Sequence, residues 1–339
     1  MMSGTTDTAR GTITEAAGSD GPGRTAALAH LAQRQGALVV LVVLCLVATT
    51  QFDSFATAAN LTSIAVQASF LAVVALGMTF VILSGGIDLS VGSVFALGGV
   101  LAAYASQYGT LAAIVLPLVV CGLIGLVQGL VIARGGLEPF IVTLAGLLFA
   151  RGLLLLVTDG GATTYRVPEG SSFRELAQGT LLGLPYPIWT VIVLYALGSV
   201  VLHRTPFGPT VLAIGGQQDA AELMGLPVAR TKVITYVASG LLAGFAGVMI
   251  ASYTSSGVTV LGVGFELTAI AAVVLGGTLL TGGSGTVLGT LVGVLLLQVM
   301  ANIINQIGNL QSAWQSVVQG SLLLAVVIAQ RYLTRAERR

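Results

Sequence analysis

A short polar motif at residues 85–93, with the sequence GGIDLSVGS, interrupts an otherwise apolar part of the chain. The runs on either side, 61–83 and 94–104, contain no charged side chain. An acidic residue among lipid-spanning segments is costly, which makes it a candidate for a functional role. We expect a helix to break here. Asp88 then either accepts hydrogen bonds from the freed backbone N–H groups or faces a conduit.

A second motif at residues 276–284, GGTLLTGGS, repeats the glycine spacing of the first. Leu279 stands where the first motif has Asp88, so the two motifs are not chemically equivalent. Interrupted hydrophobic segments at corresponding positions of two halves indicate the working region of a transporter. We interpret the pair as an internal repeat, although a Gly- and Leu-rich chain also produces accidental matches. The predicted broken-helix or gating residues are Gly85, Gly86, Asp88, Ser90, Gly92, Ser93, Gly276, Gly277, Gly282 and Gly283.

A connector at residues 203–231 contains a third candidate site. Its pattern predicts a short helix that Asp219 caps and that Gly225 ends. Such a helix presents Ala220, Leu223 and Met224 as a small apolar knob, which suits docking into a groove of a partner. The alternative is a surface turn that packs on its own bundle. The predicted coupling residues are Gly215, Gly216, Asp219, Ala221, Glu222, Leu223, Met224 and Gly225.

The elements that must position these motifs are apolar runs close to the ~20 residues that span a bilayer core. They predict an all-α integral membrane protein with about ten transmembrane helices and Gly-rich broken-helix elements. The expected runs lie near 36–52, 61–83, 90–106, 110–132, 140–157, 187–202, 232–253, 264–281, 285–305 and 313–330.

Arginines at both ends of the chain set the expected orientation. Three precede the first apolar run and four follow the last one. Positive charge favours the cytoplasmic side, so we expect a multi-pass protein of the inner (plasma) membrane with both termini in the cytoplasm. The expected divisions are a disordered cytoplasmic tail at 1–34, a transmembrane domain at 35–332 and a basic cytoplasmic tail at 333–339.

Composition argues against several other classes. The chain has 339 residues, of which only 8% are charged, and its mean hydropathy is +0.96, whereas a soluble domain is ~25% charged. A net charge of +1 argues against a basic nucleic-acid binder. The single lysine, Lys232, belongs to no phosphate-binding loop, so we expect ATP hydrolysis on another subunit. No cysteine or acidic cluster lies near His30 or His203, so we predict no metal, cofactor or catalytic residue on this chain.

The motif at 85–93, the connector at 213–225 and the stretch at 276–285, in this order, resemble one family of membrane proteins. It is the permease subunit of bacterial ATP-binding-cassette (ABC) importers for monosaccharides, the ribose, xylose and galactose permease family. The match covers roughly 37–331. The segment at 144–152, LAGLLFARG, adds similarity to the galactofuranose-type permeases in particular.

This resemblance implies a transport subunit that is not an enzyme. It also implies ATP-binding subunits docked on the connector, an extracytoplasmic sugar-binding protein on the other side, and a second permease that is identical or paralogous. The cargo implied by this resemblance is a monosaccharide such as galactofuranose or a ribose-like sugar.

A passage for a neutral sugar should offer hydroxyl and amide groups. The intramembrane candidates for this sugar path are Gln67, Gln128, Thr143, Asn302 and Asn305. Each of them alone suits a helix–helix hydrogen bond as well as a ligand contact. The alternative function is a proton- or sodium-coupled secondary sugar carrier with Asp88 and Glu266 as ion sites.

Overall fold

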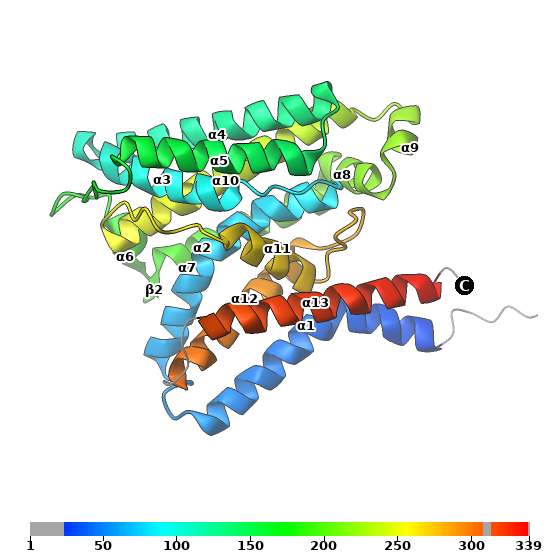
Figure 1. Ribbon diagram of the computed structural model, residues 1–339. Coiled ribbons are helices and arrows are strands. Elements are labelled where there is room, and N and C mark those ends of the chain that lie inside the picture. The colour runs from blue at the N-terminus through cyan, green and yellow to red at the C-terminus, as the bar shows by residue number, and fades with distance from the viewer. Residues whose placement is uncertain (1–23, 308–312, 338–339) are drawn as a thin grey trace, which may run out of the picture.

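The computed structural model describes residues 24–307 and 313–337, which form a bundle of α-helices with one short hairpin (Figure 1). Strands β1 and β2 of the hairpin are antiparallel, with Thr180 opposite Pro185. In chain order the elements are α1 (Arg24–Gln51), α2 (Ala58–Leu83), α3 (Val91–Ala105), η1 (Ser106–Tyr108), α4 (Thr110–Gly135), α5 (Pro139–Val157), α6 (Glu175–Gln178), β1 (Thr180–Leu181), β2 (Leu184–Pro185), α7 (Tyr186–Arg204), α8 (Phe207–Gly216), α9 (Gln218–Leu223), α10 (Val228–Thr254), α11 (Phe265–Leu275), α12 (Val287–Gln306) and α13 (Ala313–Glu337).

Helix α2 is the buried centre of the bundle. It packs against α7, α10, α11 and α12, and its side chains are buried almost continuously from Ala68 to Leu83. A helix that is apolar on every side is expected in such an interior position. Thr57 caps its start by accepting a hydrogen bond from the Asn60 backbone N–H at 3.3 Å. The helix ends before Gly85, whose φ of +78° is a conformation that glycine adopts without a steric penalty.

Small residues let α10 pack closely against α3 and α4. A Cβ atom at Gly98 of α3 would lie only 2.8 Å from the Gly244 carbonyl oxygen of α10. A Cβ atom at Gly125 of α4 would lie 2.4 Å from the Tyr236 carbonyl oxygen. Membrane helices associate through such close backbone approach. These three helices therefore form a tight unit beside the centre of the bundle.

The expected all-α membrane fold is confirmed, but the count of ten crossings is not. Within the described residues, α2, α4, α5, α7, α10 and α12 are long and apolar enough to cross a membrane, and α1, α8, α11 and α13 contain shorter apolar segments. The single helix expected at 264–281 is wrong, because α11 ends at Leu275. Gly276 and Gly277 follow directly, and glycine is a poor helix former.

The start of α1, the end of α13 and the helix α9 lie at one end of the bundle, on the right in Figure 1. The helix α6 and the β1–β2 hairpin lie at the opposite end. The tail expected at 1–34 needs one correction, since α1 already begins at Arg24. Its first turns are rich in Ala, Leu, Gln and Arg, which are strong helix formers. Residues 1–23 and 338–339 lie outside the described residues.

Candidate functional site

The first break, at residues 84–90, is held by the carboxylate of Asp88. One of its oxygens accepts hydrogen bonds from the Ser90 backbone N–H at 2.9 Å and from the Ser90 hydroxyl at 2.6 Å. The other accepts a hydrogen bond from the Ser239 hydroxyl of α10 at 2.7 Å. Asp88 is only 1% exposed. Of its two expected roles, this geometry supports the structural one, in which the carboxylate fixes the start of α3 and joins it to α10.

Side chains of α4 and α5 surround the same break. Ser90 Oγ lies 3.3 Å from Gln128 Oε1, and the Thr143 hydroxyl lies 3.3 Å from the Ile87 carbonyl oxygen. Gln128 Nε2 is buried without a hydrogen-bond partner among the described residues, and the amide packs against Gly146. We expected Gln128 and Thr143 to line a sugar path. The close approach of α4 and α5 instead buries both side chains, and they support the break.

Gly86 and Gly92, on either side of Asp88, are both closely packed against neighbouring helices. A Cβ atom at Gly86 would lie 2.5 Å from the Tyr236 hydroxyl of α10. A Cβ atom at Gly92 would lie 2.3 Å from a carboxylate oxygen of Glu266. Ser93, the next residue, is buried. Glu266, in the first turn of α11, therefore also lies beside the start of α3.

The second break, at residues 276–286, is held largely by backbone groups. The Leu279 N–H donates to the Ser284 carbonyl oxygen at 2.9 Å, and the Gly282 N–H donates to the Leu279 carbonyl oxygen at 3.0 Å. Leu279, at the position that corresponds to Asp88, contributes these bonds through its main chain. The two breaks thus differ in how their polar groups are satisfied.

The two breaks touch each other near the end of the bundle that carries α9. The Gly283 N–H donates to the carbonyl oxygen of Leu83, the last residue of α2, at 3.1 Å. A Cβ atom at Gly282 would lie 2.8 Å from the Gly85 backbone nitrogen. Predicted gating residues that are far apart in the sequence are therefore neighbours in the fold.

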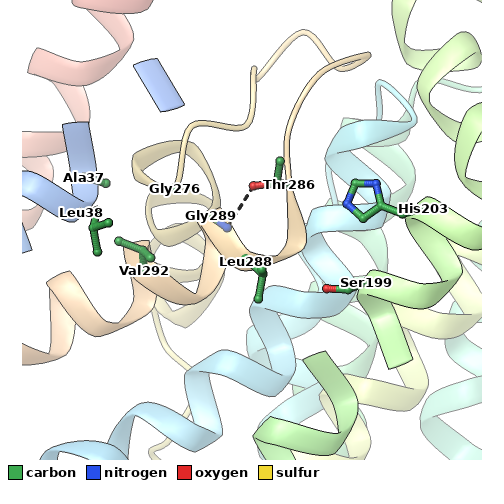
Figure 2. A pocket seen from close by; sticks show the side chains of 9 residues that line it. All are labelled: Ala37, Leu38, Ser199, His203, Gly276, Thr286, Leu288, Gly289 and Val292. Atoms are coloured by element: carbon green, nitrogen blue, oxygen red, sulfur yellow. Dashed lines mark hydrogen bonds between the residues drawn. The ribbon is translucent and has the colours of Figure 1, made fainter. Parts of the chain in front are cut away.

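A cavity of about 440 Å³ lies beside the second break, between α1, α7 and α12 (Figure 2). In Figure 2, Thr286 caps α12 by accepting a hydrogen bond from the Gly289 N–H at 3.0 Å, and His203 and Ser199 of α7 lie nearby. Its lining residues are Ala37, Leu38, Ser199, His203, Gly276, Thr286, Leu288, Gly289 and Val292. None of these nine carries a carboxylate, so the described lining offers no anionic ligand for a cation. Across the described residues, no group of three or more His, Cys, Asp or Glu side chains is placed to hold a metal.

Of the other predicted path residues, Gln67 lies on α2, and Asn302 and Asn305 lie on α12. Gln298 Nε2 donates to Gln67 Oε1 at 3.2 Å, and Asn302 Nδ2 donates to Asn60 Oδ1 at 2.8 Å. Gln67 and Asn305 are exposed. Exposed amides are costly against hydrocarbon, so a face of this kind suits a water-filled passage or another protein.

The predicted short helix in the connector is confirmed as α9, with one correction. Gln217, not Asp219, occupies the N-cap position, because the helix begins two residues earlier than a cap at Asp219 implies. Gly225 follows the helix with a φ of +76°. The Leu226 N–H then donates to the Ala221 carbonyl oxygen at 3.1 Å. This glycine-based helix ending matches the prediction.

The two faces of α9 have different surroundings. Leu223 is 90% exposed and Met224 is 68% exposed. Ala221 is fully buried and packs with Ile214 and Val228. Ala221, which we predicted as a coupling contact, therefore attaches α9 to its own bundle, because its position on the helix turns it inward. The exposed pair forms the apolar knob.

Two interrupted helices that meet inside an apolar bundle, with an exposed short helix at the same end, are features expected of a membrane transport permease. Residues 60–327 match the family described as "Branched-chain amino acid transport system / permease component", and the chain belongs to this family.

Individual relatives agree with this class. The chain is 37% identical to the ribose import permease protein RbsC of Haemophilus influenzae, with 88% of this chain and 93% of that protein covered. It is 38% identical to the L-arabinose transport system permease protein AraH of Escherichia coli, with 95% and 97% covered. It is 40% identical to the inner membrane ABC transporter permease protein YjfF of Escherichia coli, with 88% and 91% covered.

Proposed function

We propose that this chain is the transmembrane permease subunit of an ABC importer that carries a monosaccharide across the inner membrane. The observation that carries the proposal is the contact of the two breaks near α9, where the Gly283 N–H meets the Leu83 carbonyl oxygen at 3.1 Å. Irregular backbone at membrane depth is tolerated where protein or a water-filled cavity satisfies it. Such a place suits a gate.

The energy for transport would come from ATP-binding subunits that dock on α9. The exposed side chains of Leu223 and Met224 form a compact apolar surface that suits a groove on another protein. Asp219 and Glu222 are exposed on the same helix and would lie at the edge of the contact. The permease itself would hydrolyse no nucleotide.

The cargo that fits best is a neutral monosaccharide. Relatives carry the names of ribose and L-arabinose permeases, and the amides of Gln67, Asn302 and Asn305 can exchange hydrogen bonds with sugar hydroxyls. A galactofuranose-like cargo remains our prediction from the sequence. An extracytoplasmic sugar-binding protein would deliver the sugar at the end that carries α6 and the β1–β2 hairpin.

The exposed amides of α2 and α12 would face the passage between this chain and a second permease, which is identical or paralogous. Both termini would be cytoplasmic. The arginine-rich ends of the sequence support this orientation, and so does the position of α9 at the same end as the start of α1 and the end of α13.

The ion-coupled carrier finds no support in the site. Both oxygens of Asp88 already accept hydrogen bonds from Ser90 and Ser239, and the side chain is only 1% exposed, so the carboxylate is engaged in holding the break. The ABC permease family membership points to a different energy source.

The test is a docking variant with a matched control. Leu223→Asp with Met224→Asp should abolish co-purification with the ATP-binding subunit and ATP-driven sugar uptake, because a charged surface cannot fill an apolar groove. Leu137→Asp, in the loop between α4 and α5 and 54% exposed, should leave both unchanged. Normal uptake by the double variant would contradict the docking role of α9.

A further inference from the structure

The end of α8 lies against the hydrogen bond that joins the two breaks. A Cβ atom at Gly215 would lie 1.9 Å from the Leu83 carbonyl oxygen and 2.5 Å from the Gly283 backbone nitrogen. These two atoms are the acceptor and the donor of the 3.1 Å bond between the breaks. Gly215 therefore fits only because it has no side chain.

The neighbouring contacts have the same character. A Cβ atom at Gly283 would lie 2.8 Å from the Gly216 Cα atom, and one at Gly85 would lie 3.5 Å from the Gly215 Cα atom. Three chain segments thus meet backbone to backbone. We call this contact of Gly85, Gly215, Gly216, Gly282 and Gly283 the glycine junction.

The glycine junction is continuous with the docking helix. Gly216 ends α8, and Gln218 begins α9 only two residues later. The Gln217 N–H donates to the Ala213 carbonyl oxygen at 3.0 Å. The single residue between α8 and α9 is therefore held by a backbone hydrogen bond. Lys232 of α10 donates a hydrogen bond to Gln218. A displacement of α9 therefore reaches Gly215 through a short and ordered stretch of chain.

We propose that Gly215 is a positioning residue that transmits movement of α9 to both breaks at once. This inference rests on the proposed function, because it assumes that a partner moves α9. In the arrangement seen here, the Leu83–Gly283 hydrogen bond is closed and Gly215 lies against it. When the docked subunits bind nucleotide and shift α9, the end of α8 withdraws and the two breaks separate. Packed elements of this kind switch between discrete arrangements rather than deform continuously.

The competing explanation is a static one, in which the glycines only allow dense packing. The two explanations differ in what nucleotide does to the junction. A static contact stays closed throughout the transport cycle, whereas the proposed contact opens in one part of it.

The first experiment compares two glycine variants in the full importer complex. Gly215→Ala should reduce ATP-driven uptake by about tenfold or more, a typical size for a coupling effect, while the complex assembles and still hydrolyses ATP. Gly152→Ala is the matched control, because a Cβ atom at this position of α5 meets nothing within 4 Å. Its uptake should equal that of the wild type. Wild-type uptake by Gly215→Ala would overturn the proposal.

The second experiment uses the unmodified complex and is independent of how the variant folds. Hydrogen–deuterium exchange of peptides that contain the Gly283 amide is measured with and without a non-hydrolysable ATP analogue. We expect faster exchange of this amide when the analogue is bound. Exchange that does not respond to the analogue, in a complex that imports sugar, overturns the inference and leaves the proposed function standing. A wild-type complex that imports no sugar would instead refute the proposed function.

Discussion

The two breaks share a glycine pattern but are stabilised differently. The first is tied to α10 by a buried carboxylate that accepts three hydrogen bonds from Ser90 and Ser239. The second has Leu279 at the corresponding position and relies on its main chain. Replacing side-chain bonds by backbone contacts leaves the second break dependent on its neighbours, Leu83 and Gly215. When movement of α9 reaches the two breaks, we therefore expect the second to be displaced more than the first, which Asp88 ties to α10.

The largest expected effect comes from removing the carboxylate of the first break. Asp88→Ala leaves the Ser90 N–H and the Ser239 hydroxyl without their acceptor, and leaves the Ser90 hydroxyl with only Gln128 Oε1 at 3.3 Å. It should lower the free energy of unfolding by about 3 kcal/mol. Asp88→Asn keeps one acceptor oxygen and should cost less. Leu279→Asn, at the corresponding position of the second break, should change stability little, because the backbone bonds of Leu279 remain. Thermal unfolding in detergent measures all three. Equal effects of Asp88→Ala and Leu279→Asn would remove the distinction between the breaks.

A smaller difference is expected between alanine substitutions at the glycines of the two breaks. A Cβ atom at Gly283 would meet the Gly216 backbone at 2.8 Å, whereas one at Gly86 would meet the Tyr236 hydroxyl at 2.5 Å. A side-chain hydroxyl can be removed or can move, and a backbone cannot. Gly283→Ala should therefore reduce uptake more than Gly86→Ala, and Tyr236→Phe should rescue only Gly86→Ala. The measurement is initial uptake rate at equal amounts of assembled complex. Rescue of both variants, or of neither, would contradict this account.

A glycine outside the two breaks serves as a control for the backbone strain of an alanine at positive φ. Gly136 has a φ of +66° and nothing within 4 Å of its Cβ position. Gly136→Ala should cost only the penalty of a left-handed residue, about 1 kcal/mol, and should leave the uptake rate unchanged. A loss of uptake as large as that of Gly283→Ala would show that strain, not contact, explains both.

The smallest expected effect lies outside the breaks, on the amide-lined face of α2 and α12. Gln298→Leu removes the 3.2 Å hydrogen bond to Gln67 and should lower stability by less than about 1 kcal/mol. Because the Gln67 side chain would lose the bond that orients it toward the passage, the KM for sugar uptake should rise. Thr190→Val of α7, whose hydroxyl bonds only within its own helix, is the control. An unchanged KM for Gln298→Leu would remove this face from the sugar path.

The two breaks were predictable from the sequence because glycine pairs interrupt apolar runs. Gly85 marked the end of α2 within two residues, and Gly276, although predicted as a break residue, lay inside the helix expected at 264–281. Gly225 likewise marked the end of α9. Positions that demand glycine have a local signal, so a single sequence reveals them.

The partners of the gate had no such signal. Ser239 lies 151 residues from Asp88 in the chain, and nothing in its local pattern distinguishes it from other hydroxyl residues of α10. Gln128 looked like a path residue because an amide inside an apolar run suits either role. Its burial depends on Gly146 of another helix, which local sequence cannot show. The meeting of Gly283 with Leu83 depends on the packing of the whole bundle and was not predicted.

The central claim is that force from ATP-binding subunits, applied through α9, opens the contact of the two breaks for a sugar. The most direct measurement is uptake of a labelled monosaccharide by vesicles that contain this chain, its second permease, the ATP-binding subunits and the sugar-binding protein. We predict uptake that requires ATP on the α9 side and that is insensitive to proton and sodium gradients. Uptake by the chain without the ATP-binding subunits, driven by an ion gradient, would contradict the account.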